Sequence, residues 1–211
     1  MAKLLGRRKA VVVGHSTGGY SALNLAMHQS PNVLGIVCIA GFHSGKWDGV
    51  EGQLVKLAGL GAWTKPLFVA NLALAKRSRF IQRMFASFLA NDSKAYRANP
   101  RSRRMLENIR PNVVEQDAGA LFSLFRGISS LEVLDQMAAI SVPCHLFAGT
   151  HDPVVSARQS LALVGKIPHA KTVVFQGVGH MPFIESTDLY DDALERALAD
   201  IACSAPRNLG C

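Results

Sequence analysis

Three residues in this chain have the types and the order that nucleophilic catalysis requires. Ser16 is the centre of a Gly-His-Ser-Thr-Gly pattern, Asp152 lies in Gly-Thr-His-Asp-Pro, and His180 lies in Gly-Val-Gly-His-Met-Pro. A serine hydroxyl is a poor nucleophile at neutral pH, so it needs a neutral imidazole to accept its proton. The imidazole needs a carboxylate on its other nitrogen, which fixes the tautomer and stabilises the imidazolium. The sequence therefore predicts Ser16 as nucleophile, His180 as general base and then acid, and Asp152 as the group that orients His180.

The glycines around the serine predict a sharp turn from a strand into a helix. Residues 10–13 are apolar and predict a buried strand, and residues 17–28 predict a helix. We expect Gly14 and Gly18 to remove side chains that would collide within the turn. The backbone N–H of Thr17, at the start of the helix, would then donate to an oxyanion next to the exposed hydroxyl.

Apolar runs place each of the three candidates just after a predicted strand. The runs cover residues 10–13, 142–149 and 171–176, and the candidates follow them in chain order. A further run at 32–40 is apolar almost throughout, which is typical of a strand covered on both faces. Strands and helices that alternate with short connections predict a parallel α/β sheet. Ligand sites of such sheets lie beyond the carboxyl ends of the strands, where all three candidates fall.

Residues 43–137 contain no convincing strand. Glycines between positions 45 and 61 predict a loose connection into a block of helices that prolines separate. The predicted division is a core of residues 1–44 and 138–211 with an inserted helical cap of residues 45–137. The predicted helices of the cap are 66–75, 78–89, 93–99, 113–126 and 130–137, and those of the core after it are 157–164 and 186–202.

Each candidate also has a plain structural interpretation. A Gly-x-Ser-x-Gly pattern can occur by chance, Asp152 could cap a helix before Pro153, and His180 could be a turn histidine. Their order and their placement after strands favour the triad. We interpret His15 as a packed structural histidine and not as a second base.

The composition indicates a globular protein and excludes several other classes. The chain has 211 residues, of which 49% are hydrophobic and 18% charged. No apolar run approaches the ~20 residues of a membrane span, and no export signal is visible, so we expect a cytoplasmic protein without a transmembrane segment. Four cysteines lack metal-type spacing, so we expect no metal, and Cys38 and Cys144 in apolar runs predict reduced core residues.

The net charge of +8 comes largely from residues 76–104. The basic residues there alternate with apolar ones, which is typical of amphipathic helices with a solvated basic face. No motif points to nucleic acid, and we expect no nucleic-acid partner.

Taken together, the motifs resemble those of the α/β-hydrolase fold. Residues 4–26 resemble the nucleophile elbow of that family, residues 149–155 its acid loop, and residues 177–185 its histidine loop, G-x-G-H-x-x-x-x-E. The sequence around the serine, Gly-His-Ser-Thr-Gly-Gly, is similar to that of esterases and cofactor-free haloperoxidases. The resemblance implies a mostly parallel sheet with flanking helices, a helical cap, no cofactor, and a small and apolar acyl substrate. It also implies a substrate pocket that we expect to involve Phe42, His43, Trp47, Phe122, Phe125 and Val154, although each of these could serve packing alone.

The chain departs from the family pattern at its start. In complete members several strands precede the elbow strand, and a loop after one of them supplies a second oxyanion donor. Here residues 2–8 look like the end of the helix that leads into the elbow strand. We therefore expect an N-terminally truncated sheet with an open elbow-strand edge, through which copies could self-associate. A fragment or wrongly chosen start and a short protein completed by another chain are the two explanations.

The resulting prediction is a serine hydrolase that cleaves a carboxylic ester or related acyl compound through an acyl-enzyme on Ser16. One alternative is another reaction on the same triad, namely perhydrolysis of the haloperoxidase type, carbon–carbon bond hydrolysis or lactone opening. A second alternative is a catalytically silent binding module that keeps the fold.

Overall fold

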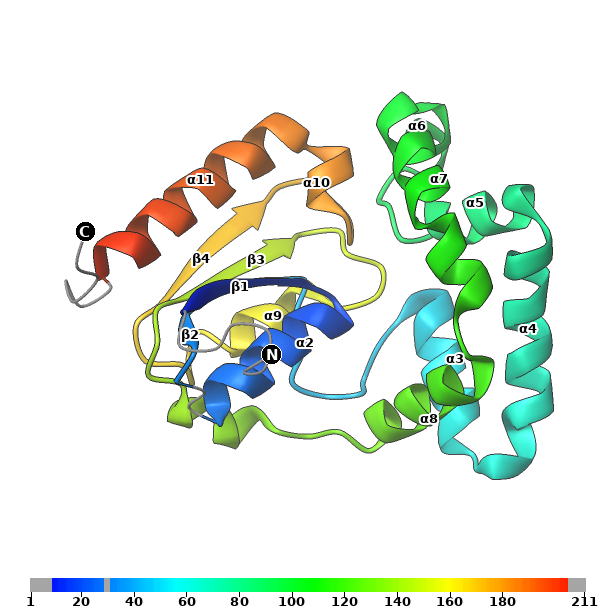
Figure 1. Ribbon diagram of the computed structural model, residues 1–211, viewed down its shortest axis with the longest axis horizontal. Coiled ribbons are helices and arrows are strands. Elements are labelled where there is room, and N and C mark those ends of the chain that lie inside the picture. Colours follow the sequence, from blue (N-terminus) through cyan, green and yellow to red (C-terminus); the bar gives the residue numbers. More distant parts are fainter. Residues whose placement is uncertain (1–8, 29–30, 205–211) are drawn as a thin grey trace.

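A computed structural model describes residues 9–28 and 31–204, and within these residues four parallel strands form one sheet in the order β1-β2-β3-β4 (Figure 1). Each strand pairs with its neighbour in register, for example Val13 with Val37 and Phe147 with Val173. Because all strands are parallel, their carboxyl ends meet at one edge of the sheet. The strands are β1 (Ala10–His15), β2 (Val33–Ile39), β3 (Cys144–Gly149) and β4 (Ala170–Phe175).

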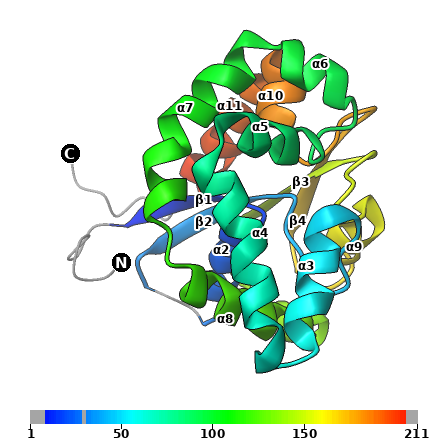
Figure 2. The ribbon, with the colours of Figure 1, turned by 90° about the vertical axis from the view of Figure 1, so that its right-hand side faces the viewer.

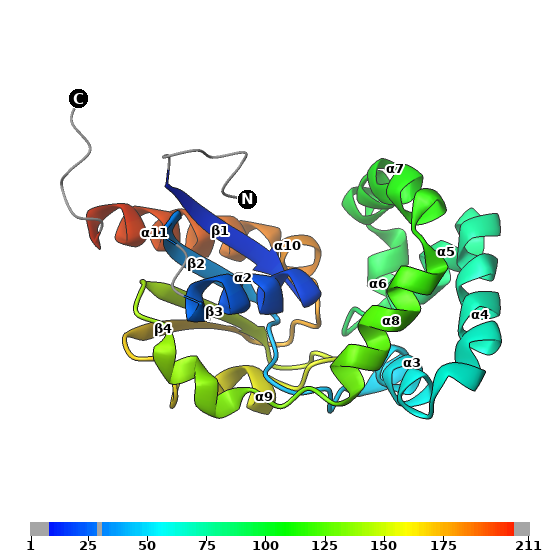
Figure 3. The ribbon, with the colours of Figure 1, turned by 60° about the horizontal axis from the view of Figure 1, so that its bottom comes forward.

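Helices cover both faces of this sheet, as Figure 3 shows. On one face α2 (Thr17–Met27), α9 (Ala157–Ala162) and the 3-10 helix η2 (Leu134–Ala139) pack against side chains that include Ile36 and Leu146. On the other face α11 (Thr187–Ser204), preceded by the short α10 (Pro182–Glu185), packs against Val37 and Phe147. In β2 and β3 neighbouring residues thus point to opposite faces, and the residues on both faces are buried. This double burial explains why these two strands are almost entirely apolar, whereas the edge strand β4 also carries exposed residues.

The remaining helices form a separate layer beyond the carboxyl ends of the strands, and we call it the helical block (Figure 1). Seen face on in Figure 2, α3, α4 and α8 lie side by side, in agreement with their mutual contacts. The block therefore faces the loops that follow β1, β3 and β4. It comprises α3 (Gly49–Gly59), η1 (Ala62–Thr64), α4 (Lys65–Arg77), α5 (Arg79–Ser87), α6 (Ser93–Ala98), α7 (Pro100–Glu115) and α8 (Ala118–Ser129).

The loose connection expected at the start of the block was wrong, because α3 forms there. Its glycines serve close packing instead of flexibility. A Cβ on Gly52 would lie 2.3 Å from the carbonyl oxygen of Trp47, and one on Gly59 would lie 2.9 Å from the Ser129 side chain. Tertiary contact thus outweighs the low helix propensity of glycine, which is only about 1 kcal/mol per residue.

Two other helix predictions need correction. The helix expected at 113–126 is divided, because α7 continues through Pro111 to Glu115 and α8 starts anew at Ala118. The start of α8 is fixed by Asp117, whose side chain accepts a hydrogen bond from the Ala120 N–H at 2.7 Å. The helix expected at 130–137 is the 3-10 helix η2, shifted a few residues along the chain.

The sheet has an edge at β1, which pairs only with β2 in the part of the chain that the structure describes. The Val13 side chain there is 45% exposed. Self-association through this edge stays a prediction, and the helix end expected at residues 2–8 lies outside the described residues. Cys38 and Cys144 are buried free cysteines, as expected, and burial raises the pKa of the Cys144 thiol to about 12. No helix among the described residues is both long and apolar enough to cross a membrane.

Candidate active site

Ser16 occupies a strained backbone conformation at the tip between β1 and α2. Its φ of 55° and ψ of −117° lie in a region that costs a non-glycine residue about 1–3 kcal/mol. Two hydrogen bonds hold it there. Its N–H donates to the Ile39 carbonyl at 2.8 Å, and its own carbonyl accepts from the Tyr20 N–H at 3.0 Å. The neighbouring strand and the following helix therefore fix the serine where a side chain projects from the sheet edge.

The glycines that are close-packed in the turn are not the pair that the sequence predicted. A Cβ on Gly14 would lie 2.1 Å from the Gly18 carbonyl oxygen, so that position accepts no side chain. Gly19 is also close-packed, since its Cβ would lie 3.1 Å from both Cys38 Sγ and the Ile39 carbonyl oxygen. A Cβ on Gly18 would meet nothing within 4 Å, so the expectation that its side chain would collide was wrong.

His180 and Asp152 form a buried hydrogen-bonded pair. His180 Nδ1 lies 2.7 Å from Asp152 Oδ2, and both side chains are almost fully buried. The other carboxylate oxygen of Asp152 accepts from the backbone N–H groups of Val154 and Val155 at 2.8 and 3.0 Å. An ionised carboxylate only accepts, so Nδ1 is the donor of this hydrogen bond, and Nε2 is the ring nitrogen left for another partner. Asp152 is therefore both the partner of the histidine and the residue that organises its own turn.

The loops that carry this pair are tied to each other. The His151 N–H donates to the Val178 carbonyl at 2.9 Å, and the Gly177 N–H donates to the Thr150 hydroxyl at 2.9 Å. The loops approach so closely that a Cβ on Gly149 would lie 2.2 Å from the Gly179 carbonyl oxygen. The geometry of the pair thus depends on glycine in the strand end as well as on the two side chains.

Glu185, the last residue of the histidine-loop motif, organises the backbone on both sides of His180. Its carboxylate accepts from the N–H groups of Gly179 and Met181 at 3.0 and 3.2 Å. It also accepts from the N–H of Asn91 in the helical block at 2.9 Å. The motif was recognised in the sequence, but this role was not assigned, because the Asn91 contact joins residues far apart in the chain.

His15 is packed against His180 and is held in the neutral form. Its Nε2 lies 2.8 Å from the His180 carbonyl oxygen, and the two rings are 4.7 Å apart. Burial, reinforced by the nearby His180, lowers the pKa of His15 from 6.5 to about 4. The neutral imidazole donates to that carbonyl, as its interpretation as a packed structural residue requires.

The structure brings the three candidates to one edge of the sheet, since they follow β1, β3 and β4. Within the described residues no hydrogen bond joins Ser16 Oγ to His180 Nε2. Such bonds are often long in ligand-free enzymes and tighten when substrate binds. Thr17 is the first residue of α2, so its N–H has no carbonyl partner within the helix and can serve an oxyanion.

A cleft of about 620 Å³ opens beside the elbow, between α2 and α8. Thr17 and Gly18 line it together with the expected pocket residue Phe42. Phe125 lines a smaller cavity inside the helical block. The other expected pocket residues, His43, Trp47, Phe122 and Val154, line neither space. Of these, Trp47, Phe122 and Val154 are buried in apolar clusters, and His43 pairs with Glu132 at 3.0 Å.

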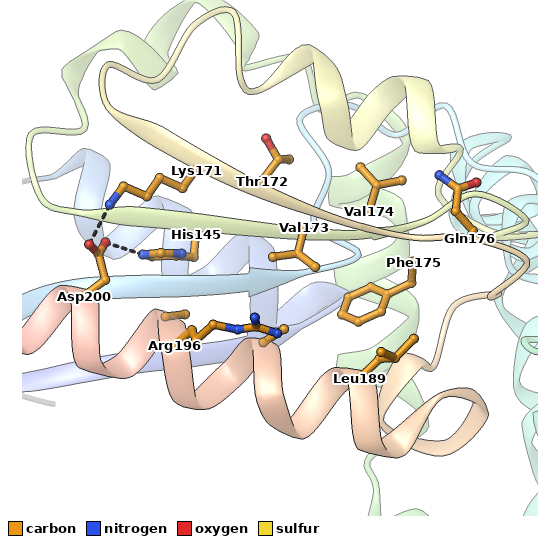
Figure 4. A pocket seen from close by; sticks show the side chains of 12 residues that line it. His145, Lys171, Thr172, Val173, Val174, Phe175, Gln176, Leu189, Arg196 and Asp200 are labelled. Atoms are coloured by element: carbon orange, nitrogen blue, oxygen red, sulfur yellow. Dashed lines mark hydrogen bonds and ion pairs between the residues drawn. The ribbon is translucent and has the colours of Figure 1, made fainter.

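A groove of about 600 Å³ between β4 and α11 lies away from these residues (Figure 4). There Asp200 pairs with Lys171 at 2.6 Å and with His145 at 2.8 Å, as the dashed lines in Figure 4 mark. Both bonds lower the pKa of Asp200. They attach the end of α11 to the starts of β3 and β4, which is a structural role. The described residues contain no cluster of three side chains that could hold a metal ion.

The fold and this constellation define a class of protein, a hydrolase built on a parallel α/β sheet with a serine at a strand-to-helix elbow. The family model for the alpha/beta hydrolase fold matches residues 2–187, and the chain belongs to that family.

Comparison with individual proteins supports the same class. The chain is 25% identical over 190 residues to a pimeloyl-(acyl-carrier protein) methyl ester esterase of Vibrio atlanticus, covering 87% of this chain and 68% of that protein. A thermophilic esterase from Thermogutta terrifontis has a similar structure, with a TM-score of 0.66 at 20% identity over 95% of this chain and 68% of that one. An enol-lactonase from Burkholderia xenovorans LB400 gives a TM-score of 0.64 at 20% identity, covering 94% and 68%. The likeness to these two solved structures shows the fold.

Proposed function

We propose that the chain is a serine esterase that hydrolyses a carboxylic ester through an acyl-enzyme on Ser16. The observation that carries the proposal is the strained elbow serine at the same sheet edge as the buried His180–Asp152 pair. The curated relatives, which are named methyl ester esterases, support an ester as the substrate. The helical block is the cap in this proposal, and its expected bounds are residues 45–137.

In the first step Ser16 Oγ attacks the ester carbonyl carbon while His180 Nε2 takes the hydroxyl proton. The carbonyl oxygen becomes an oxyanion, to which the Thr17 N–H donates. The oxyanion collapses, the carbon–oxygen bond to the alcohol breaks, and the alcohol leaves with the proton from His180. Asp152 stabilises the imidazolium through the 2.7 Å contact to Nδ1.

In the second step water replaces the alcohol. His180 Nε2 takes a proton from the water, whose oxygen attacks the acyl carbon. The second oxyanion collapses, the bond to Ser16 Oγ breaks, and the proton on His180 returns to the serine. The products are the carboxylic acid, the alcohol and the free enzyme.

Hydrolysis of short p-nitrophenyl esters by the wild-type chain and by Ser16→Ala tests this mechanism. We expect the variant to lose activity by about 10³-fold or more, because no other nucleophile occupies the elbow. Ser204→Ala, an exposed position at the end of α11, is the matched control and should keep wild-type activity. Hydrolysis that survives in Ser16→Ala would refute the acyl-enzyme on Ser16.

A fluorophosphonate probe distinguishes an esterase from a silent binding module. We expect the probe to label Ser16 in the wild-type chain and to leave Ser16→Ala unlabelled, since only an activated serine reacts. A folded wild-type chain that stays unlabelled would favour the silent module.

A further inference from the structure

The first turn of α3 is fixed directly over the loop that carries Asp152. The Asp48 N–H donates to the Val154 carbonyl at 2.8 Å. Gly49 has a φ of +62°, and a Cβ at that position would lie 2.6 Å from the Pro153 carbonyl oxygen. The close approach and the left-handed backbone both require glycine. Side chains of this turn therefore have a defined position relative to the triad candidates.

Glu51, two residues after Gly49, places in this setting a carboxyl group of which one oxygen has no hydrogen-bond partner. Its Oε2 is buried and makes no hydrogen bond. Burial raises the pKa of Glu51, its own backbone N–H opposes that change, and the charges of His180 and Asp152 act on it. An unsatisfied buried polar group costs about 1–3 kcal/mol. A protonated carboxyl is the form that lowers this cost, and it is a hydrogen-bond donor.

Glu51 also lines the cavity of about 150 Å³ inside the helical block. The other lining residues include Leu54, Phe68, Leu72 and Phe125, and Glu51 is the one ionisable residue among those that line it. At about 30 Å³ per water molecule, the volume suits a short acyl chain. The space is thus apolar except for the Glu51 carboxyl group, on which the charges of His180 and Asp152 act, and the Asn71 amide.

We propose that Glu51 is a specificity-determining residue of the esterase, and that it donates a hydrogen bond to a second carbonyl oxygen in the acyl chain of the substrate. The inference rests on the proposed function of Ser16. A plain alkyl chain would leave the buried carboxyl unsatisfied, whereas a keto, amide or second ester carbonyl supplies the missing acceptor. The substrate class is therefore an ester whose acyl chain carries a further neutral carbonyl group.

Two esters of equal chain length test the proposal, namely p-nitrophenyl levulinate, which has a keto group, and p-nitrophenyl pentanoate, which has none. We expect the wild-type chain to favour levulinate by about tenfold in kcat/KM, which corresponds to one hydrogen bond. Glu51→Leu should abolish this preference, and Glu51→Gln should retain most of it because the amide also donates. Gln53→Leu, an exposed position on α3, is the matched control and should behave as wild type.

A binding measurement separates failure of this inference from failure of the esterase proposal. The Ser16→Ala variant, with and without Glu51→Leu, is titrated with methyl levulinate and methyl pentanoate in a calorimeter. We expect tighter binding of the levulinate only where Glu51 is present. Equal affinities for the two esters, or a kcat/KM ratio unchanged in Glu51→Leu, would overturn the role of Glu51. Absence of turnover in the wild type together with preserved binding selectivity would count against the esterase alone.

Discussion

His15 and His180 show how one residue type takes two roles in the same site. The two rings are 4.7 Å apart, yet only His180 has a carboxylate on its Nδ1. His15 donates to a backbone carbonyl and lies where burial disfavours its charged form. A second positive charge beside His180 would oppose the imidazolium that forms during catalysis, so a neutral His15 suits the proposed mechanism.

The lowered pKa of His15 predicts a loss of stability in mild acid. Between its pKa of about 4 in the folded chain and its ordinary 6.5, the unfolded chain binds more protons. The free energy of unfolding therefore falls as pH drops through this window, by up to about 3 kcal/mol in total. Urea unfolding at pH 7 and pH 5 should show a smaller difference for His15→Gln than for wild type.

The control for this measurement is His28→Gln, because His28 is exposed. We expect its pH dependence to match that of the wild type. An equal loss of stability in wild type and His15→Gln between the two pH values would contradict the assignment of the effect to His15.

At the scale of elements, the turn between β1 and α2 provides a matched pair of glycines. Gly14→Ala should lower the free energy of unfolding by about 1–3 kcal/mol, because the new methyl group would overlap the Gly18 carbonyl. Gly18→Ala should be neutral or stabilising by about 0.5–1 kcal/mol, since it has open space and lies in a helix. Thermal unfolding of both variants measures the contrast. Equal destabilisation by the two substitutions would show that the turn is not packed as described.

Elements and site residues differ in how well the sequence predicts them. The strands β2 and β3 were predicted because burial on both faces leaves long apolar runs, and β1 and β4 because each still holds a short apolar run. Ser16, Asp152 and His180 were selected as candidates because each follows an apolar run within a local motif. The helix α3 was missed because its glycines are explained by contacts with Trp47 and Ser129, and no local pattern records those contacts.

The role proposed for Glu51 had no sequence signal for the same reason. It depends on a turn that Gly49 and Asp48 attach to the loop after β3, about a hundred residues further along the chain. The sequence thus predicts those residues of the candidate site that lie in short motifs. Where a contact joins distant segments, only the folded chain reveals it.

At the scale of the whole molecule, the helical block and the sheet meet at the residue that carries the proposed base. The His180 N–H donates to the Leu89 carbonyl at 2.9 Å, and the Asn91 side chain donates to the Gly177 carbonyl at 2.9 Å. Glu185 adds three accepted bonds across and along the same junction. A displacement of the block would therefore move the His180 backbone, so under the proposed mechanism we expect the block to influence catalysis beyond forming the walls of a pocket.

This coupling makes Glu185 a positioning residue for His180. Glu185→Leu leaves three N–H groups without their acceptor, and we expect kcat for p-nitrophenyl ester hydrolysis to fall by about 10–100-fold, as for other groups that orient a catalytic side chain. KM should change little, because Glu185 lines neither the elbow cleft nor the cavity inside the helical block. Glu185→Gln should recover part of kcat, since one amide oxygen still accepts. Glu195→Gln on the exposed side of α11 is the control. A fall in thermal stability with kcat unchanged would assign Glu185 to the fold alone, whereas a loss of kcat with faster amide exchange at Asn91 would show that the block and the base move together.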